Sequence, residues 1–193
     1  MSEDFESIYQ AGGWNGKGSG PGSTELFTRE FRKVFERLLV DLKVRSVFDL
    51  GCGDWQWQRH LKWPAGIQYE GWDVSESAVS AARIAIQDTT ANRPFLVNVM
   101  DAFAAPVWPE RDLLLVKDIV HHLSRFRVRQ LIERAKLYDY VIWVVDLDLQ
   151  RSVCNWPGST DEFMNKCGFV YDFDYSIDRY PFGPKSAFLQ INP

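Results

Sequence analysis

Residues that could do chemistry gather at four places in the sequence, each directly after a short apolar run. Glycines and a cysteine follow the first run, single acids follow the second and third, and a lysine, an acid and two histidines follow the fourth. Glycines let a ligand approach the main chain, carboxylates accept hydrogen bonds, and histidine is the natural proton acceptor near neutral pH. In chain order, the candidates are Asp49, Gly51, Cys52, Gly53, Asp73, Asp101, Lys117, Asp118, His121 and His122.

The elements that must position these residues alternate between strand and helix patterns. Continuous apolar strands between amphipathic helices predict an α/β domain with a mainly parallel sheet, which binds ligands outside the carboxyl ends of its strands. We expect strands at 46–50, 67–72, 94–100, 112–117 and 140–146, and a final pair joined by a turn within 169–192. We expect helices at 24–40, 55–62, 75–87, 124–137 and 160–168.

The loop Gly51-Cys52-Gly53 suits close approach of a ligand, because two of its three residues lack a side chain. A nicotinamide dinucleotide site would read G-x-G-x-x-G, but the sixth place here is Gln56. No Arg or Lys lies between Ser46 and Gln58, so the loop offers little help to a pyrophosphate. A ligand without phosphate fits this loop better, and a plain tight turn is the alternative.

Two acids extend this pattern to the next strand ends. Asp73 lies about where an acid accepts hydrogen bonds from ribose hydroxyls in nucleotide sites. Asp101 could accept a bond from an exocyclic adenine amine. Either acid could instead cap the helix or turn that follows it. The glycine loop and Asp73 together are more informative than either one alone.

The segment KDIVHH contains two of the three histidines, the third being His60. A histidine after the fourth strand could act as a general base near neutral pH. The alternative for each is that it packs under the following helix as a core residue.

Composition limits the classes of protein to consider. The net charge of −4 and a pI near 5.4 disfavour a large nucleic-acid interface, which needs a basic surface. Three cysteines without a C-x-x-C pair indicate neither a zinc site nor a disulfide framework, and no metal site is expected. The N-terminus lacks an apolar signal region and no apolar run could span a bilayer, so we expect a cytoplasmic protein without membrane partners.

The motifs VFDLGCGD, EGWDVS, NVMDAF and DLLLVKDIVHHL resemble, in order and spacing, those of class I S-adenosylmethionine-dependent methyltransferases. The resemblance covers about residues 24–193. It implies a Rossmann-like class I methyltransferase fold, with a mostly parallel seven-stranded sheet, an antiparallel terminal strand and helices on both faces. It also implies S-adenosyl-L-methionine as cofactor.

The resemblance further implies roles for individual residues. The methionine part of the cofactor would meet the first loop, the ribose would meet Asp73, the adenine would be flanked by Val74, and the sulfonium would lie beside Lys117 and Asp118. His122 is the first choice for the base, with His121 and Asp118 as alternates. The remaining contacts implied are Asp49, Gly51, Cys52 and Gly53 for the methionine part, and Asp101 and Ala102 for the adenine edge.

Two features of the chain need separate interpretations. Trp55 stands where the common motif has a third glycine, so either the next helix starts farther from the strand or the indole forms part of the pocket wall. Residues 1–23 are glycine-rich, and we interpret them as a lid in which Trp14 covers the cofactor, ahead of a single domain at 24–193. A disordered tail is the alternative.

The predicted activity is methyl transfer to an O or N nucleophile of a small-molecule acceptor. The chain has no large inserted domain, lacks the Asp/Asn-Pro-Pro-Tyr/Phe run of amino-methylating nucleic-acid enzymes, and has Asp146 where a ribose-methylating enzyme would need Lys. The alternatives are a macromolecular or glycan acceptor and a non-catalytic cofactor- or partner-binding module.

Four arginines within 125–134 fit a solvated helix face or, as the minority view, an anionic acceptor. The oligomeric state stays open.

Overall fold

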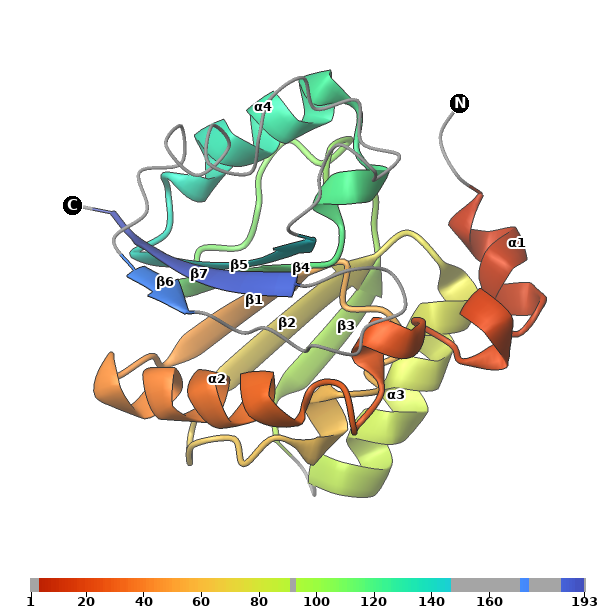
Figure 1. Cartoon of the computed structure of the whole chain (residues 1–193), viewed down its shortest axis with the longest axis horizontal. Helices are drawn as coiled ribbons and strands as arrows, with labels where there is room; N and C mark the ends of the chain where they lie inside the picture. Colours follow the sequence, from red (N-terminus) through yellow and green to blue (C-terminus); the bar gives the residue numbers. More distant parts are fainter. Residues whose placement is uncertain (1–3, 91–92, 147–170, 174–184, 193) are drawn as a thin grey trace. The chain divides into compact units, whose positions relative to one another are not determined.

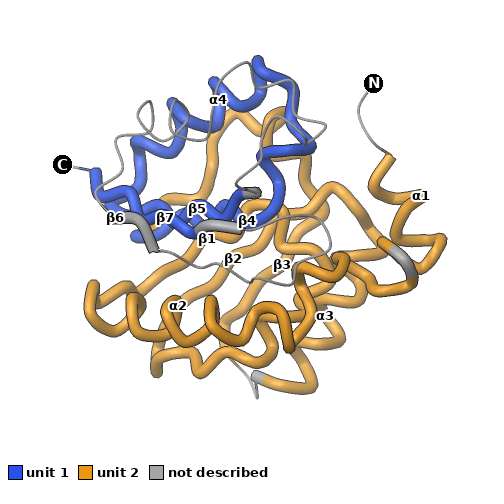
Figure 2. Tube along the Cα trace, viewed as in Figure 1, with its two compact units in different colours: residues 1–2, 112–193 blue, residues 3–111 orange. Residues whose placement is uncertain are grey.

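The computed structural model describes residues 4–90, 93–146, 171–173 and 185–192. They fall into two compact units (Figure 2). The first in chain order is Glu3–Arg111, drawn in orange as unit 2, and the second is Asp112–Pro193, drawn in blue as unit 1 together with Met1–Ser2. The N-terminal glycine-rich segment belongs with the first unit. None of the described helices is long and apolar enough to cross a membrane.

The first unit is built on three parallel strands with helices against them (Figure 1). β2 lies between β1 and β3, and Asp49↔Gly71 and Asp73↔Val99 are paired in register, which brings the ends of neighbouring strands together. The elements are α1 (Phe5–Gln10), η1 (Trp14–Gly16), η2 (Pro21–Ser23), α2 (Arg29–Asp41), β1 (Ser46–Leu50), η3 (Gln58–His60), β2 (Gln68–Asp73), α3 (Glu76–Thr90) and β3 (Phe95–Val99).

Aromatic side chains fill the space between these strands and α2. Phe35 of α2 is fully buried and meets Trp57 and Trp63 edge-on, at ring-centroid distances of 5.8 and 6.1 Å. Trp63 in turn meets Tyr69 of β2 at 5.3 Å. Because edge-to-face rings pack densely, this cluster holds α2 against the strands that carry the candidate site.

The second unit continues the strand and helix alternation. β4 (Leu113–Lys117) and β5 (Tyr140–Asp146) are parallel, whereas β7 (Lys185–Ile191) is antiparallel both to β5 and to β6 (Tyr171–Phe173). η4 (Val120–His122) and α4 (Arg125–Ala135) follow β4. α4 buries Val128, Leu131, Ile132 and Ala135, and the Ser124 side chain accepts a hydrogen bond from the Arg127 N–H at its start.

The sequence predicted the strands well and the first helix poorly. Every expected strand through 140–146 is present within one or two residues of its predicted bounds, and β6 and β7 pair as the expected final strands. The helix expected from residue 24 begins at Arg29, because the preceding carbonyls are engaged by turns such as Thr28 Oγ1 to Thr24 O. Leu26, expected on its apolar face, is therefore exposed. The expected helix 160–168 and the final turn lie outside the described residues.

The helix expected at 55–62 is reduced to the single 3₁₀ turn η3, because Trp55 cannot join a helix. Its φ is +62°, a left-handed conformation that costs a residue with a side chain about 1–2 kcal/mol. Its indole is fully buried, stacks on Trp63 with ring planes 5° apart, and meets Tyr69 and Phe95. Trp55 therefore replaces the third glycine of the motif by contributing its ring to the core, and the helical turn starts farther from β1.

Restoring glycine at this place should destabilise the protein. Trp55→Gly relieves the strained φ but deletes a buried indole, whose truncation costs about 3–5 kcal/mol. We expect a net loss of about 2 kcal/mol in the free energy of unfolding, measured by urea denaturation. Trp55→Ala keeps the strain, so it should be about 1 kcal/mol less stable than Trp55→Gly. A glycine variant as stable as the wild type would contradict this account.

Helix α1 was not predicted, and it is held to α3 by one carboxylate. Glu6 Oε2 accepts bonds from Ser75 Oγ at 2.7 Å and Ser77 N at 3.2 Å, and Ser77 Oγ donates to Glu6 Oε1 at 2.5 Å. These donors lie at the start of α3, where an acid is favoured by unsatisfied N–H groups and the helix dipole. The bonds from Ser77 and Ser75 lower the pKa of Glu6 from 4.5 to about 2.

Removing this charge should release α1. A carboxyl whose pKa is lower in the folded state stabilises that state above the ordinary pKa, and it loses this effect as the pH falls. The wild-type contact should therefore weaken between pH 4.5 and about 2. In Glu6→Gln, amides of residues 5–10 should exchange hydrogen faster at neutral pH. Glu76→Gln, an exposed acid in the same turn of α3, is the control. Equal exchange in both variants would count against the Glu6 contact.

Candidate functional site

The loop after β1 turns sharply and lies against β2. Gly51 and Gly53 have φ of +74° and +59°, and the N–H groups of Gly51 and Cys52 both donate to Trp72 O, at 2.8 and 3.1 Å. Cys52 is buried against Gly71, where a Cβ would overlap the Cys52 side chain. The glycines therefore let the loop fold back over the end of the neighbouring strand.

Asp73 closes this loop from the side. Its Oδ2 accepts from Gly53 N at 2.9 Å, and its Oδ1 accepts from Ser75 N at 3.0 Å. Burial raises the pKa of Asp73, although these bonds oppose the shift. Each carboxylate oxygen has a further lone pair, so the half-buried group can accept bonds from a ligand. The glycine loop and Asp73, predicted to act together, are in direct contact.

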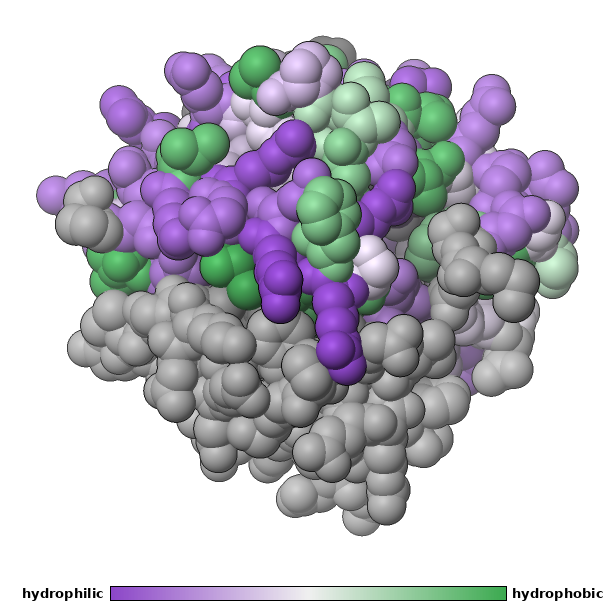
Figure 3. Space-filling model, turned by 90° about the horizontal axis from the view of Figure 1, so that it is seen from above, coloured by the Kyte–Doolittle hydropathy of each residue, from purple (hydrophilic) through white to green (hydrophobic). Residues whose placement is uncertain are grey.

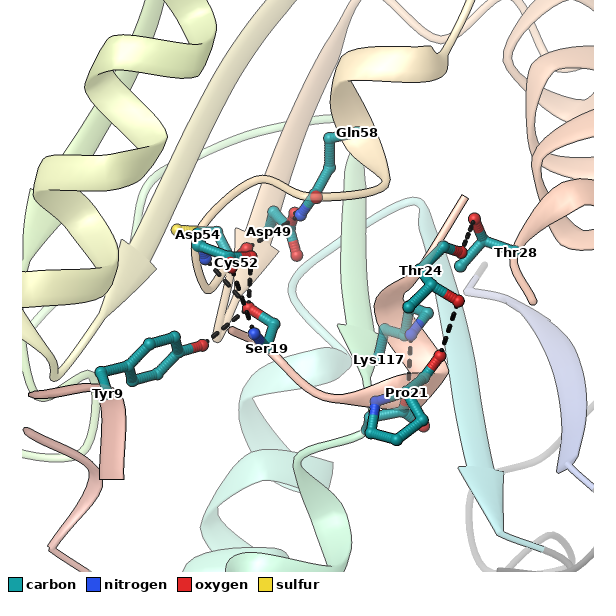
Figure 4. Close-up of polar contacts among 11 residues, drawn as sticks. Tyr9, Ser19, Pro21, Thr24, Thr28, Asp49, Cys52, Asp54, Gln58 and Lys117 are labelled. Atoms are coloured by element: carbon teal, nitrogen blue, oxygen red, sulfur yellow. Dashed lines mark hydrogen bonds and ion pairs between the residues drawn. The ribbon is translucent and has the colours of Figure 1, made fainter. Parts of the chain in front are cut away.

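Asp49 supports the loop from beneath. It is 1% exposed, and its Oδ2 accepts from Tyr69 Oη at 2.7 Å and from Gln58 Nε2 at 2.9 Å. Gln58 Nε2 also donates to Cys52 O at 2.9 Å, so the same amide joins β1 to the loop (Figure 4). These contacts show Asp49 holding the loop through the protein interior.

The N-terminal segment covers the loop from the other side through Ser19 and Asp54 (Figure 4). Ser19 Oγ donates to Asp54 Oδ1 at 2.6 Å, Ser19 N donates to Asp54 Oδ2 at 3.2 Å, and Asp54 N donates back to Ser19 Oγ at 3.0 Å. Tyr9 Oη lies 2.7 Å from the same Ser19 Oγ. Residues 4–23 are therefore docked on the loop, which makes them part of the candidate site.

Sequence reasoning passed over Tyr9, Ser19 and Asp54. Asp54 directly follows the glycine loop, so its position in the sequence could have indicated that it belongs to the candidate site. The contacts of Ser19 and Tyr9 depend on the path of the N-terminal segment, which no local pattern reveals. A Cβ at Gly18 would overlap the Asp54 carboxylate, so glycine is required there for the segment to reach the loop.

Trp14 lies within this segment, beside two other aromatic rings. It packs edge-on against Tyr9 at a ring-centroid distance of 5.6 Å and is tilted against Phe5 at 6.2 Å. Its indole therefore supports the position of Tyr9. The expected contact of Trp14 with a cofactor stays a proposal.

The ends of β2 and β3 present acceptor and apolar groups together. Asp101 Oδ1 accepts from Phe103 N at 2.9 Å, which is the turn contact foreseen as the alternative for this residue. Met100 N donates to Asp73 O at 2.8 Å, so the two strand ends are joined. Ala102 is buried, and its carbonyl accepts from Trp108 Nε1. The exposed apolar side chains at the ends of β2 and β3 are Val74, Val99 and Met100.

The candidates after β4 belong to the second unit. Asp118 has a φ of +59°, and its Oδ2 lies 2.6 Å from the buried Lys117 Nζ. The rings of His121 and His122 lie 4.0 Å apart between centroids, and both residues are half-buried. The structure thus brings an ion pair and two adjacent imidazoles to the segment between β4 and α4.

The arginine run lies on α4. Arg125 and Arg129 are exposed, together with Phe126, whose side chain is 69% exposed. Figure 3 looks onto the side of the molecule that bears α4, where hydrophilic residues are interleaved with hydrophobic ones. This pattern fits the solvated-face interpretation of the arginines.

Sequence comparisons do not place the chain. No family model matches it, and no curated protein matches its sequence. Any likeness to known proteins therefore has to come from the structure.

Solved structures match along most of the chain. The N-methyltransferase NodS from Bradyrhizobium japonicum matches with a TM-score of 0.68 and 15% identity, covering 86% of this chain and 97% of that one. Magnesium protoporphyrin IX methyltransferase from Synechocystis, with bound SAH, matches with a TM-score of 0.64 and 17% identity, covering 85% of this chain and 82% of that one. The bifunctional kinase-methyltransferase WbdD matches with a TM-score of 0.65 and 19% identity, covering 100% of this chain and 44% of that one.

These identities are too low to show more than the fold, but the fold agrees with the strand directions within each unit. The described strands are mostly parallel, with β7 antiparallel to its neighbours. The chain has the Rossmann-like fold of the class I S-adenosylmethionine-dependent methyltransferases.

Proposed function

We propose that the protein is an S-adenosylmethionine-dependent methyltransferase that acts on an O or N nucleophile of a small-molecule acceptor. The observation that carries this proposal is the contact between Asp73 and Gly53, at the ends of two neighbouring parallel strands. Asp73, the proposed ribose-binding carboxylate, would thus lie beside the glycine main chain that meets the cofactor. Sheets of this kind bind ligands at such strand ends.

The residues of this edge fit the cofactor by chemical type. Asp73 would accept bonds from the ribose diol, and the exposed Val74 and Met100 would flank the adenine. Main chain at Asp101 and Ala102 would meet the adenine edge. The loop contains no cation between Ser46 and Gln58, which suits a ligand without phosphate. When bound, the cofactor would supply an electrophilic methyl group on a sulfonium.

The protein's own contribution to the reaction would be positioning and removal of one proton. Holding an acceptor in line with the methyl group supplies much of the rate enhancement in such a displacement. His122 would take the proton from a hydroxyl or ammonium acceptor, with His121 and Asp118 as alternates. Asp118 Oδ2 is engaged by Lys117 Nζ at 2.6 Å, and an imidazole is the natural proton acceptor near neutral pH.

One neighbour supports a small acceptor by its printed name, a magnesium protoporphyrin IX methyltransferase, and another, the N-methyltransferase NodS, supports transfer to nitrogen. A larger acceptor would need an extended basic or aromatic surface. In the part of the chain described, the three tryptophans between β1 and β2, and Trp72 within β2, are buried in the core and do not form such a surface.

Calorimetric titration with S-adenosylmethionine, S-adenosylhomocysteine and NAD tests the cofactor. We expect heat with both adenosyl compounds and none with NAD. Asp73→Asn should weaken S-adenosylhomocysteine binding about 10–100-fold, because bonds to a charged acceptor contribute about 1.5–3 kcal/mol. Asp88→Asn, an exposed acid on α3, is the control. Folded protein that binds neither adenosyl compound would refute the proposal.

The same titration should depend on pH in a defined direction. The carboxylate form of Asp73 accepts the ribose hydroxyls, and burial raises its pKa above 3.8. As the pH is lowered, the affinity for S-adenosylhomocysteine should therefore start to fall at a higher pH than it would with an aspartate of ordinary pKa. Asp73→Asn should lack this component.

His122 is tested by turnover, once a screen with labelled methyl groups has identified an acceptor. His122→Ala should lower kcat about 10²–10⁴-fold, the usual contribution of a general base, with S-adenosylhomocysteine affinity unchanged. His60→Ala, in η3, serves as the matched control. Unchanged turnover in His122→Ala would assign the base elsewhere. A screen in which no acceptor is methylated would instead favour a non-catalytic binding module.

A further inference from the structure

If the proposed function holds, on which this subsite rests, the protein must bind the amino-acid end of the cofactor. That end carries an ammonium group, which needs oxygen acceptors. Asp49, the acid that precedes the loop in sequence, is 1% exposed and engaged by Tyr69 and Gln58. Its carboxylate is thus committed to the interior.

A second set of acceptors lies directly over the glycine loop. A Cβ on Gly53 would overlap Ser19 Oγ and lie 3.0 Å from Tyr9 Oη. Ser19 Oγ and Tyr9 Oη therefore pack directly against the main chain of Gly53, and a ligand at the edge of this loop would meet both hydroxyl groups. Asp54, which binds Ser19 through both of its carboxylate oxygens, follows in the same loop.

The direction of these hydrogen bonds follows from proton counting. Ser19 has a single hydroxyl proton and donates it to Asp54 Oδ1, at 2.6 Å. The bond between Tyr9 and Ser19 therefore has Tyr9 as donor, and the phenolic oxygen keeps its lone pairs as acceptors. Burial and the nearby Asp73 charge raise the pKa of Tyr9, so the phenol stays protonated. The group combines a carboxylate with an oriented neutral acceptor.

We propose that Tyr9, Ser19 and Asp54 form the subsite for the ammonium end of the cofactor, so that the N-terminal segment, which is docked on the loop, is held there more firmly as a strap when that end binds. Asp54 supplies the negative charge, Ser19 orients its carboxylate, and the Tyr9 oxygen accepts a further bond. Glu6, bound at the start of α3, anchors the far end of the strap. Exchange of the cofactor then requires Ser19 to leave Asp54.

Two ligands that differ only at this end provide the test. S-adenosylhomocysteine carries the amino-acid group, whereas 5′-methylthioadenosine shares the adenosine and thioether but lacks it. Ser19→Ala should weaken S-adenosylhomocysteine binding about tenfold or more and leave 5′-methylthioadenosine within about twofold. Tyr9→Phe keeps the ring that packs on Trp14 and should show a smaller loss in the same direction. Ser80→Ala, exposed on α3, is the control.

Hydrogen exchange gives an independent readout on the wild-type chain. Amides of residues 4–23 should be protected by S-adenosylhomocysteine and not by 5′-methylthioadenosine. Equal losses for both ligands in Ser19→Ala, or equal protection by both, would overturn the subsite while leaving the cofactor assignment intact. Wild-type protein that binds neither ligand would overturn the proposed function itself.

Discussion

The reciprocal hydrogen bonds between Ser19 and Asp54 are the constraint on which the candidate site depends. Each residue donates its N–H to the other's side chain, and the Ser19 hydroxyl adds a third bond. Residues far apart in the sequence are thereby joined over the turn that ends β1. Together with the Glu6 contact at the start of α3, this pairing brings Tyr9 to Gly53.

The same loop is held from beneath by groups that water hardly reaches. Asp49, Tyr69 and Gln58 form a buried polar set whose members satisfy one another, and Gln58 extends it to the carbonyl of Cys52. Trp55 adds an anchor in the aromatic core at the expense of a strained backbone. The loop is thus fixed by interior contacts on one side and by the N-terminal segment on the other, which leaves its glycine main chain with little freedom.

The strands and the acids at their ends were predictable because the information is local. A buried parallel strand is a continuous apolar run, and its carboxyl end is where the run stops, so Asp73 and the segment KDIVHH could be placed from the sequence. Helix starts were less predictable. The apolar spacing of 24–40 continues through residues that form hydrogen-bonded turns, and α2 itself begins only at Arg29.

The glycine-rich segment was the hardest to interpret, since glycine serves both flexibility and close packing. Its composition favoured a lid or a tail, whereas in the structure Gly18 has positive φ and leaves space for the Asp54 carboxylate. Trp14 was predicted to cover the cofactor, which stays a prediction, and the structure adds that its ring packs edge-on against Tyr9. Neither distinction can be made without knowing which side chain lies opposite each glycine.

The sequence by itself determined the α/β class, the order of the strands along the chain, and the acids and histidines that end them, because these follow from apolar runs and the residues directly after them. Only the tertiary structure decided that Asp49 supports the loop from within, that Trp55 enters the core, and that Tyr9 and Ser19 meet Asp54. The physical reason is that hydrogen bonds and ring contacts depend on distances in space between residues tens of positions apart, which periodicity and local propensity do not encode.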